Sequence, residues 1–588
     1  MTPQTDYTRL FLAVFLAAIV LFSWQALVEW PRRQHLAQMT VAQAKQRAVA
    51  EAKHAEEIPA KSAEAEENPD LTRQRRLALS PRITVNSSTL HGSIALKGAR
   101  FDDLVLARYK ETIDPNSPDV TLFSPNGDKE AFFAQVGWLA QGGTKVPDQR
   151  TLWQADKTSL APGETVHLRW DNGEGVTFLL SVSLDRNYMF DIASRVENHS
   201  GHAISLLPYG YVNRAWEEPA QRNLVVHEGP LGVMTGTLDE VTYKDLREKG
   251  NKVYDDASGW FGITDKYWLA ALVPAAGHNK VTFSHYAANG QQRYQTDYLG
   301  SAVSVADRGS SESTIRLFAG AKEINLLDHY AKGYDTEPPI PLFDRAIDFG
   351  MLYFLTRPML LTLNFFHALI GNFGIAIMLL TIVVRLLLYP LANKSYHAAA
   401  SMRALQPEMT KLRERYFDDQ ITLNKEMLSL YKREKVNPAS GCLPVLLQMP
   451  VFFALYRVLY VSIEMRHAPF FGWIRDLSVA DPSNLFTLFG LIPWEPPGVM
   501  HLGLLPIAMC ATMIIQMRQQ PKPADPTQAR MMTWMPYFML FLFARMPAGL
   551  VLYWTWSNLI SILQQRVITI QHERKKAKKA RKARNAAA

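Results

Sequence analysis

Arg385 is the residue whose type and position most need a chemical explanation, because it lies inside the apolar run GIAIMLLTIVVRLLLYPL. It follows Phe373 by twelve residues, and a helix that rises about 1.5 Å per residue would place it about 18 Å along the helix axis. Arginine keeps its proton in proteins, so a charge at that depth needs a carboxylate, a cage of backbone oxygens or water.

The other apolar segments supply no counter-charge for Arg385. Residues 443–463, 499–517 and 531–567 contain neither Asp nor Glu, and Glu464 lies at an edge. An unpaired charge in a dry interior is very costly, so we expect a hydrated cavity that opens to the cytoplasm, where the helix of Arg385 ends. The alternative is that Arg385 snorkels to the cytoplasmic headgroups from the helix end.

Polar side chains recur at helical spacing where they could line this cavity. Thr381 precedes Arg385 by four residues and shares its helix face. Gln448 adds an amide from another apolar segment. The last apolar segment carries hydroxyls and amides at intervals of four, four and three residues: Tyr553, Ser557, Ser561 and Gln564. Hydrogen bonding between packed helices would explain each residue alone, but beside an unpaired arginine they favour a wet groove.

The predicted opposite wall of the groove is apolar. Its residues are Met449, Phe452, Phe453 and Tyr456, together with Met509, Met513 and Met517 at four-residue spacing. Flexible methionines suit varied apolar partners, although ordinary helix packing is the alternative.

The excess positive charge of the chain is concentrated at its C-terminal end. The sequence has 63 Lys and Arg against 55 Asp and Glu, a net charge of +8, and residues 566–588 hold nine basic residues against Glu573. The remainder is neutral, which argues against a nucleic-acid-binding surface over the whole molecule. The tail residues expected to contact anionic lipids or the ribosome are Arg574, Lys575, Lys576, Lys578, Lys579, Arg581 and Lys582.

The N-terminal half of the chain predicts an anchor, a linker and a β domain. Residues 1–30 include 19 consecutive uncharged residues, which predict an uncleaved transmembrane anchor. Residues 31–80 are rich in Ala, Glu, Lys and Gln and predict a linker. A period of two then predicts a large antiparallel β-sandwich over residues 81–341.

The C-terminal half predicts the helical membrane core that positions the groove. Residues 342–371 predict an amphipathic helix at the membrane interface, which Gly371 and Asn372 end. Residues 372–567 contain five candidate spans, one of them only 15 residues long. Together with the N-terminal anchor, the sequence predicts six membrane spans. Residues 393–440 predict an antiparallel helical hairpin between the first two spans of the core.

Basic residues in the loops predict the orientation of the spans. Residues 393–440 hold nine Lys and Arg, and the tail, residues 568–588, holds eight, whereas residues 466–482 hold only Arg466 and Arg475. By the positive-inside rule both termini face the cytoplasm and the β domain lies outside, in the periplasm of a bacterium with two membranes.

The sequence favours no enzymatic chemistry. Cys442 and Cys510 are its two cysteines, which excludes a disulfide framework and a cysteine-rich metal site. The P-loop, HExxH and GxSxG motifs are absent. We therefore expect no catalytic residue, no metal, no cofactor and no small-molecule substrate.

Three long motifs resemble those of one family. VNPASGCLPVLLQMP, GNFGIAIMLLTIVVRLLLYPL and AGLVLYWTWSNLISILQQ resemble the YidC family of bacterial inner-membrane insertases, whose relatives serve mitochondria and chloroplast thylakoids. The resemblance covers about residues 345–570, and the anchor with its β domain is similar to the Gram-negative form. It implies five helices around a groove that is open to the cytoplasm and to lipid and closed to the periplasm.

The resemblance also implies a function. Members insert and fold nascent membrane proteins in the inner membrane, alone or beside the Sec translocon, with ribosomes delivering the clients. The predicted substrate-binding groove consists of Arg385, Thr381, Gln448, Met449, Phe452, Tyr553, Trp554 and Ser557. Trp554 stands where the family pattern has a second tyrosine, and Arg457 where it has an uncharged residue. We expect Arg457 to snorkel toward the outer side.

Two other functions fit the sequence less well. A secondary transporter usually places Asp, Glu or His in its spans and often shows internal repeats, and neither is visible in this sequence. A periplasmic sensor that signals through the hairpin would need a ligand for the β domain.

Overall fold

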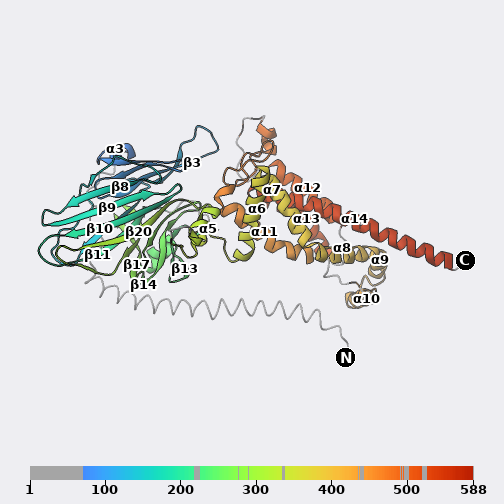
Figure 1. Cartoon of the computed structure of the whole chain (residues 1–588). Coiled ribbons are helices and arrows are strands. Elements are labelled where there is room, and N and C mark those ends of the chain that lie inside the picture. The colour runs from blue at the N-terminus through green and yellow to red at the C-terminus, as the bar shows by residue number, and fades with distance from the viewer. Residues whose placement is uncertain are drawn as a thin grey trace, which may run out of the picture. The chain divides into compact units, whose positions relative to one another are not determined.

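The computed structural model describes residues 71–586 except 218–225, 276, 289, 334–337, 435, 437–442, 491, 493, 495–501 and 520–525. The predicted anchor and most of the predicted linker lie outside the described residues. The chain divides into two units. Among the described residues, one unit comprises those within 71–111, 118–321 and 326–346, and the other comprises those within 347–586 with the short segments 112–117 and 322–325. Figure 1 shows that strands build the first unit and helices the second.

The first unit contains two sheets. The strands of one sheet are β1 (Arg82–Asn86), β2 (Leu90–Ala95), β3 (Arg100–Lys110), β4 (Asp119–Phe123), β5 (Phe132–Ala140), β7 (Ser159–Leu160), β11 (Ile204–Ala215), β14 (Lys252–Ala257), β17 (Asn279–Ala288), β18 (Gln291–Leu299) and β19 (Val303–Val305). Their order is β14-β17-β18-β11-β5-β3-β2-β1-β7, with β4 beside β3 and β19 beside β11.

The strands of the other sheet are β6 (Gln154–Ala155), β8 (Thr165–Asp171), β9 (Val176–Leu184), β10 (Met189–Asn198), β12 (Gly229–Met234), β13 (Thr237–Glu240), β15 (Gly259–Thr264), β16 (Trp268–Pro274) and β20 (Ser310–Ala321). Their order is β13-β12-β15-β16-β20-β10-β9-β8-β6. Among the described strands, pairing is antiparallel except between β1 and β7.

Aromatic side chains join the two sheets into a sandwich. Phe101 of β3 contacts Phe190 of β10 edge to face, with ring centroids 5.3 Å apart. Phe261 of β15 lies 6.1 Å from Tyr298 of β18. All four side chains are buried. The period of two therefore predicted the β-sandwich, because alternate residues of each strand fill the space between two sheets.

Short helices complete the first unit: α3 (Arg73–Leu77), α4 (Tyr243–Lys249), α5 (Ile324–Lys332) except its first two residues, and η5 (Phe343–Ala346). α3 falls at the end of the predicted linker, yet it packs on the sandwich. Arg73 pairs with Asp103 and donates to Ser124 at 3.1 Å, and Arg76 is buried. The part of the predicted linker that is described thus belongs structurally to the β unit.

The second unit is built from α6 (Tyr353–Ile370), α7 (Phe373–Leu387), α8 (Tyr389–Ala404), α9 (Gln406–Arg415), α10 (Gln420–Arg433), α11 (Leu443–Val461), η7 (Ile463–Met465), η8 (Leu485–Gly490), α12 (Leu504–Arg518), α13 (Pro526–Phe543) and α14 (Ala548–Ala586). α14 contacts α7, α11 and α12, and α6 contacts α7 and α11. The predicted groove residues therefore lie on α7, α11 and α14, and α14 contacts both of the other helices.

The break between α6 and α7 follows from two residues. Gly371 has a φ of 76°, a conformation that favours glycine, and its N–H bonds the carbonyl oxygen of His367. Asn372 then caps α7 by accepting from the N–H of Ile375.

Within the described residues, no single helix has both the length and the hydropathy of a membrane span. Phe373–Leu387 and Tyr389–Ser395 meet the two criteria together, as a pair bent by 67°. The sequence predicted one continuous span here. The bend follows from Pro390, which has no N–H to donate and disfavours helical geometry in Tyr389.

The predicted helical hairpin consists of the end of α8 with α9 and α10. Its core is formed by Leu405, Met409, Met427 and Leu430. Asp419 caps α10 by accepting from the N–H groups of Ile421 and Thr422. Pro407 lies in the first turn of α9, where its missing N–H costs nothing. Apolar residues at three- and four-residue spacing predicted this core.

α14 continues through the basic tail. Its helix runs from Ala548 to Ala586, which is longer than the predicted last span of 550–567. Arg574 is exposed. The basic residues predicted to contact lipid or ribosome therefore belong to this helix.

Glu464 is a buried carboxylate in η7, just beyond the end of α11. Its Oε1 accepts from the N–H of Ile324 at 3.0 Å, and Ile324 belongs to the segment 322–325 of the helical unit. Burial raises the pKa of Glu464 to about 7, against 4.5 for an ordinary glutamate. The unfolded chain therefore loses this proton at lower pH than the folded protein does.

We expect Glu464→Gln to stabilise the protein at pH 8. Between pH 4.5 and 7 the folded state holds a proton that the unfolded state has lost, so wild-type stability falls as pH rises through this window. The expected gain above pH 7 is about 3 kcal/mol, and it should vanish below the unfolded pKa. Thermal unfolding in detergent at several pH values measures it. The exposed control Glu414→Gln should show no such pH dependence, and a constant offset for Glu464→Gln would contradict the assignment.

Candidate functional site

Arg385 lies in the last turn of α7 and reaches across to α14. Its Nη2 donates to the hydroxyl of Ser557 and, at 3.2 Å, to the carbonyl oxygen of the same residue. Its buried Nε has no hydrogen-bond partner. No carboxylate in the described part of the chain pairs with Arg385. The guanidinium is thus held by neutral oxygens that leave its charge uncompensated.

Gln448 and Tyr553 form a second contact one helical turn away. The Nε2 of Gln448 in α11 donates to the hydroxyl of Tyr553 in α14. Tyr553 is 1% exposed, so this hydroxyl is removed from solvent. For this pair, hydrogen bonding between packed helices, the alternative considered from sequence, describes what the structure shows.

The remaining hydroxyls serve their own helices. Thr381 is buried and donates to the carbonyl oxygen of Ile377 at 2.7 Å. Ser561 is buried and donates to the carbonyl oxygen of Ser557 at 2.9 Å. The Ser557 carbonyl therefore accepts from both Ser561 and Arg385. Gln564, at the end of the stripe, has an Nε2 without a partner.

Trp554 fills an aromatic cluster. Its ring lies 4.9 Å from that of Phe452 in α11 and 5.0 Å from that of Phe543 in α13. Phe452 and Phe543 are 5.8 Å apart. The indole therefore replaces the expected tyrosine as a packing group that joins three helices, and not as a hydroxyl donor.

Exposed apolar side chains lie beside these contacts on α11 and α13. Met449 is 37% exposed and Phe453 is 51% exposed. α13 exposes Met531, Trp534, Met535, Tyr537, Phe538, Phe541 and Leu542. Sequence reasoning missed the α13 surface, although Met531, Trp534, Phe538 and Phe541 recur at three- and four-residue spacing. That spacing was the available signal.

Two of the predicted wall methionines on α12 are buried, whereas Met517 is half-buried. Met509 is 0% exposed and Met513 is 8% exposed, so ordinary helix packing, the alternative considered from the sequence, accounts for these two residues. The Nδ2 of Asn558 in α14 donates to the hydroxyl of Thr512 in α12 at 3.2 Å. α12 thus packs against α14.

Arg457, which was expected to snorkel outward, lies in an ion pair that the sequence did not predict. Its Nη2 pairs with Asp348, and its Nε donates to the carbonyl oxygen of Asp348 at 2.9 Å. The two side chains are 17% and 14% exposed. A nearby carboxylate is a better partner for a guanidinium than distant headgroups, because the pair satisfies both charges over a short reach.

Comparison with known proteins assigns the chain to a family. Residues 365–576 match the family described as 60Kd inner membrane protein, and residues 82–362 match the family described as YidC periplasmic domain. The membrane protein insertase YidC of Rickettsia bellii is 43% identical over 570 residues, which cover 96% of this chain and 99% of the relative. That of Bradyrhizobium diazoefficiens is 42% identical over 599 residues, covering 96% of each.

A solved structure described as active YidC insertase is also similar. It is 18% identical, covers 82% of this chain and 92% of its own, and has a TM-score of 0.35. The sequence relatives are named as insertases, and their names describe no enzymatic reaction. Because they match over nearly the whole length of the chain, the chain belongs to the YidC family of membrane protein insertases.

Proposed function

We propose that the chain inserts nascent membrane proteins into the inner membrane, alone or with the Sec translocon, without catalysing a chemical reaction. The observation that carries this proposal is the uncompensated charge of Arg385 in a helical unit that also exposes apolar faces on α11 and α13. A client with a hydrophilic flank and an apolar segment needs both kinds of surface. The names of the relatives point to the same function.

The contact between Arg385 and Ser557 suggests how a client engages. A hydroxyl and a carbonyl are neutral acceptors, whereas a carboxylate on the client would make a stronger charge-assisted bond with the same guanidinium. The acidic flank would therefore displace Ser557 and rest at Arg385 in a hydrated groove. Thr381, Gln448, Met449, Phe452, Tyr553 and Trp554 complete the proposed substrate-binding site.

The apolar segment of the client moves along the exposed faces of α11 and α13 into lipid. Met449, Phe453 and Phe538 offer it soft contacts that demand no single sequence. Transfer of roughly 20 apolar residues out of water supplies the driving force.

The same proposal fixes the orientation. The chain crosses the membrane six times, with both termini in the cytoplasm and the β unit in the periplasm, because basic residues concentrate in residues 393–440 and in the tail. The helical extension of α14 would then lie on the cytoplasmic side, where its basic residues would bind ribosomal RNA or the anionic headgroups of the inner leaflet.

Photocrosslinking to a stalled nascent membrane protein tests this path. With a photoreactive residue at Met449, Phe453 or Phe538, we expect adducts with the apolar segment of the client, since these positions are exposed on the proposed path. The adducts are separated by mass and identified with an antibody to the client.

Two positions serve as controls for the crosslinking. Leu455 lies on α11 but is 0% exposed. Leu559 is 43% exposed on α14, and two residues beyond Ser557 correspond to about 200° around the helix, so it faces away from Arg385. Adducts from Leu559 as strong as those from Phe453, or none from the three test positions, would reject the proposed path.

A further inference from the structure

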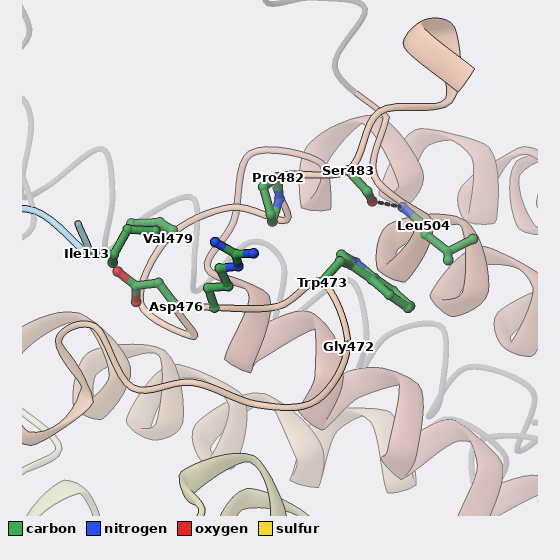
Figure 2. A pocket seen from close by; sticks show the side chains of 9 residues that line it. Ile113, Gly472, Trp473, Asp476, Val479, Pro482, Ser483 and Leu504 are labelled. Carbon is green, nitrogen blue, oxygen red and sulfur yellow. Dashed lines mark hydrogen bonds between the residues drawn. The ribbon is translucent and has the colours of Figure 1, made fainter. Parts of the chain in front are cut away.

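A pocket of about 490 Å³ lies in the helical unit, away from Arg385 along the chain. It is lined by Ile113, Gly472, Trp473, Arg475, Asp476, Val479, Pro482, Ser483 and Leu504. Figure 2 shows Ile113 and Val479 at one end and Trp473 with Leu504 at the other. Its volume falls in the range of small-molecule sites, and nothing in the proposed path of the client uses it.

The walls of the pocket are fixed by Asp481. This carboxylate is 1% exposed and accepts from the indole N–H of Trp473 at 3.0 Å and from the backbone N–H of Leu505 at 2.8 Å. Ser483 accepts from the N–H of Leu504 at 2.8 Å, as the dashed line in Figure 2 shows. A Cβ on Gly503 would come within 2.8 Å of the Asp481 side chain, so glycine permits this close approach. The loop therefore caps α12 and orients Trp473 before any ligand arrives.

The exposed charge at the pocket belongs to Arg475. Asp481 is buried and already accepts hydrogen bonds from Trp473 and Leu505. Asp476 is 5% exposed and accepts hydrogen bonds from the N–H and the hydroxyl of Ser478. Arg475 is exposed, and within the described part of the chain it has neither an ion pair nor a side-chain hydrogen bond. Arg475 is thus the charged group of this pocket that an anionic ligand can reach.

The surface around Arg475 is apolar. Trp473 is 44% exposed, and Val479 and Ile113 are each 52% exposed. Phe471, next to the pocket in sequence, is 60% exposed. Exposed tryptophan beside aliphatic side chains and one arginine is typical of the level of lipid headgroups in a membrane.

We propose that this pocket binds a phospholipid of the outer leaflet, with the phosphate at Arg475 and the start of an acyl chain against Trp473 and Val479. The inference rests on the proposed orientation, which places the C-terminal end of α11 and the start of α12 at the outer face. Charge complementarity supplies the affinity for an anionic amphiphile, and the apolar walls select against a free soluble anion.

Such a lipid would also affect the helix that holds Arg385 through Ser557. The carbonyl oxygen of Val479 accepts from the N–H of Ala548 at 2.7 Å, and that of Leu477 accepts from the N–H of Gly549 at 2.9 Å. The loop that forms the pocket therefore bonds the first amides of α14, the helix that carries Ser557. A bound lipid would hold this loop and with it the N-terminal end of α14.

Native mass spectrometry of the purified full chain tests the proposal without any client. The protein is stripped of lipid in detergent and titrated with phosphatidylglycerol, and the number of retained lipids is counted. We expect Arg475→Gln to weaken the tightest binding event about tenfold, the value of one charge-assisted hydrogen bond. Val479→Trp, which fills the pocket, should abolish that event. Arg545→Gln is the matched control, because Arg545 is exposed, lies between α13 and α14 at the same proposed face, and does not line the pocket.

The outcomes separate this proposal from the function of the chain. Retention by Arg475→Gln equal to that of wild type, or a loss as large in Arg545→Gln, overturns the proposal, as does displacement of the lipid by millimolar glycerol phosphate. All variants should elute and melt as folded protein, since Arg475 and Val479 are exposed. Because the titration contains no nascent chain, its failure leaves the crosslinking test at Met449 and Phe453 standing.

Discussion

Replacing Arg385 with alanine is expected to lower the insertion of a client with an acidic flank at least about tenfold. The substitution removes the charge at which that flank rests, and a hydrogen bond to a charged group is worth about 1.5–3 kcal/mol, or roughly tenfold to a hundredfold. Arg385→Lys should retain more activity, because a hydrated ammonium supplies the same charge without the guanidinium geometry. Protease protection of the client in proteoliposomes measures the insertion.

Paired clients and a neighbouring variant make this prediction specific. A client whose acidic residues are replaced with Asn should lose much less on Arg385→Ala than the acidic client does. Ser557→Ala should keep most activity, because it removes a neutral acceptor and leaves the charge of Arg385 in place. Equal losses for Arg385→Lys and Arg385→Ala would show that guanidinium geometry matters more than charge. Equal losses for the acidic and Asn clients would contradict the electrostatic role.

Local patterns predicted the elements of this fold well. Period-two alternation predicted the sandwich, and apolar residues at three- and four-residue spacing predicted the packing of the hairpin around Met409 and Met427. Gly371 and Asn372 predicted the break between α6 and α7. These features depend on residues that are close in sequence, where spacing and turn chemistry act directly. The bend at Pro390 followed from the same rules, but the apolar composition around it favoured a continuous span.

The candidate site was harder to predict, because its contacts join distant segments. Composition indicated that the apolar segments offer Arg385 no acid, yet it could not indicate that Ser557, 172 residues away, would hold the guanidinium. A stripe of apolar residues also has the same sequence pattern whether it faces a protein core or lipid. For that reason Met509 was assigned to an exposed wall although it is buried, and the exposed stripe containing Phe538 on α13 was missed.

Arg457 is the departure from the family pattern whose consequence can be measured most directly. It pairs with Asp348, 109 residues earlier, and Asp348 also accepts from the N–H of Gly350 at 3.1 Å. Gly350 has a φ of 65°, and a Cβ there would lie 3.4 Å from the Nε of Arg457. The segment before α6 is therefore shaped around the guanidinium. Removing either charge would leave the other largely buried without its partner.

We expect Arg457→Leu to destabilise the protein by about 3 kcal/mol, because it leaves the carboxylate of Asp348 without its cationic partner in a site that is mostly shielded from water. For a helical unit of this size the midpoint of thermal unfolding should fall by roughly 6–12 °C. The double variant Arg457→Leu/Asp348→Asn should recover most of that loss, since neither charge then remains. Arg545→Leu, at an exposed position, should change the midpoint by no more than about 2 °C. If the double variant melts as low as the sum of the two single variants predicts, the residues are uncoupled and the pair does not anchor α6 to α11.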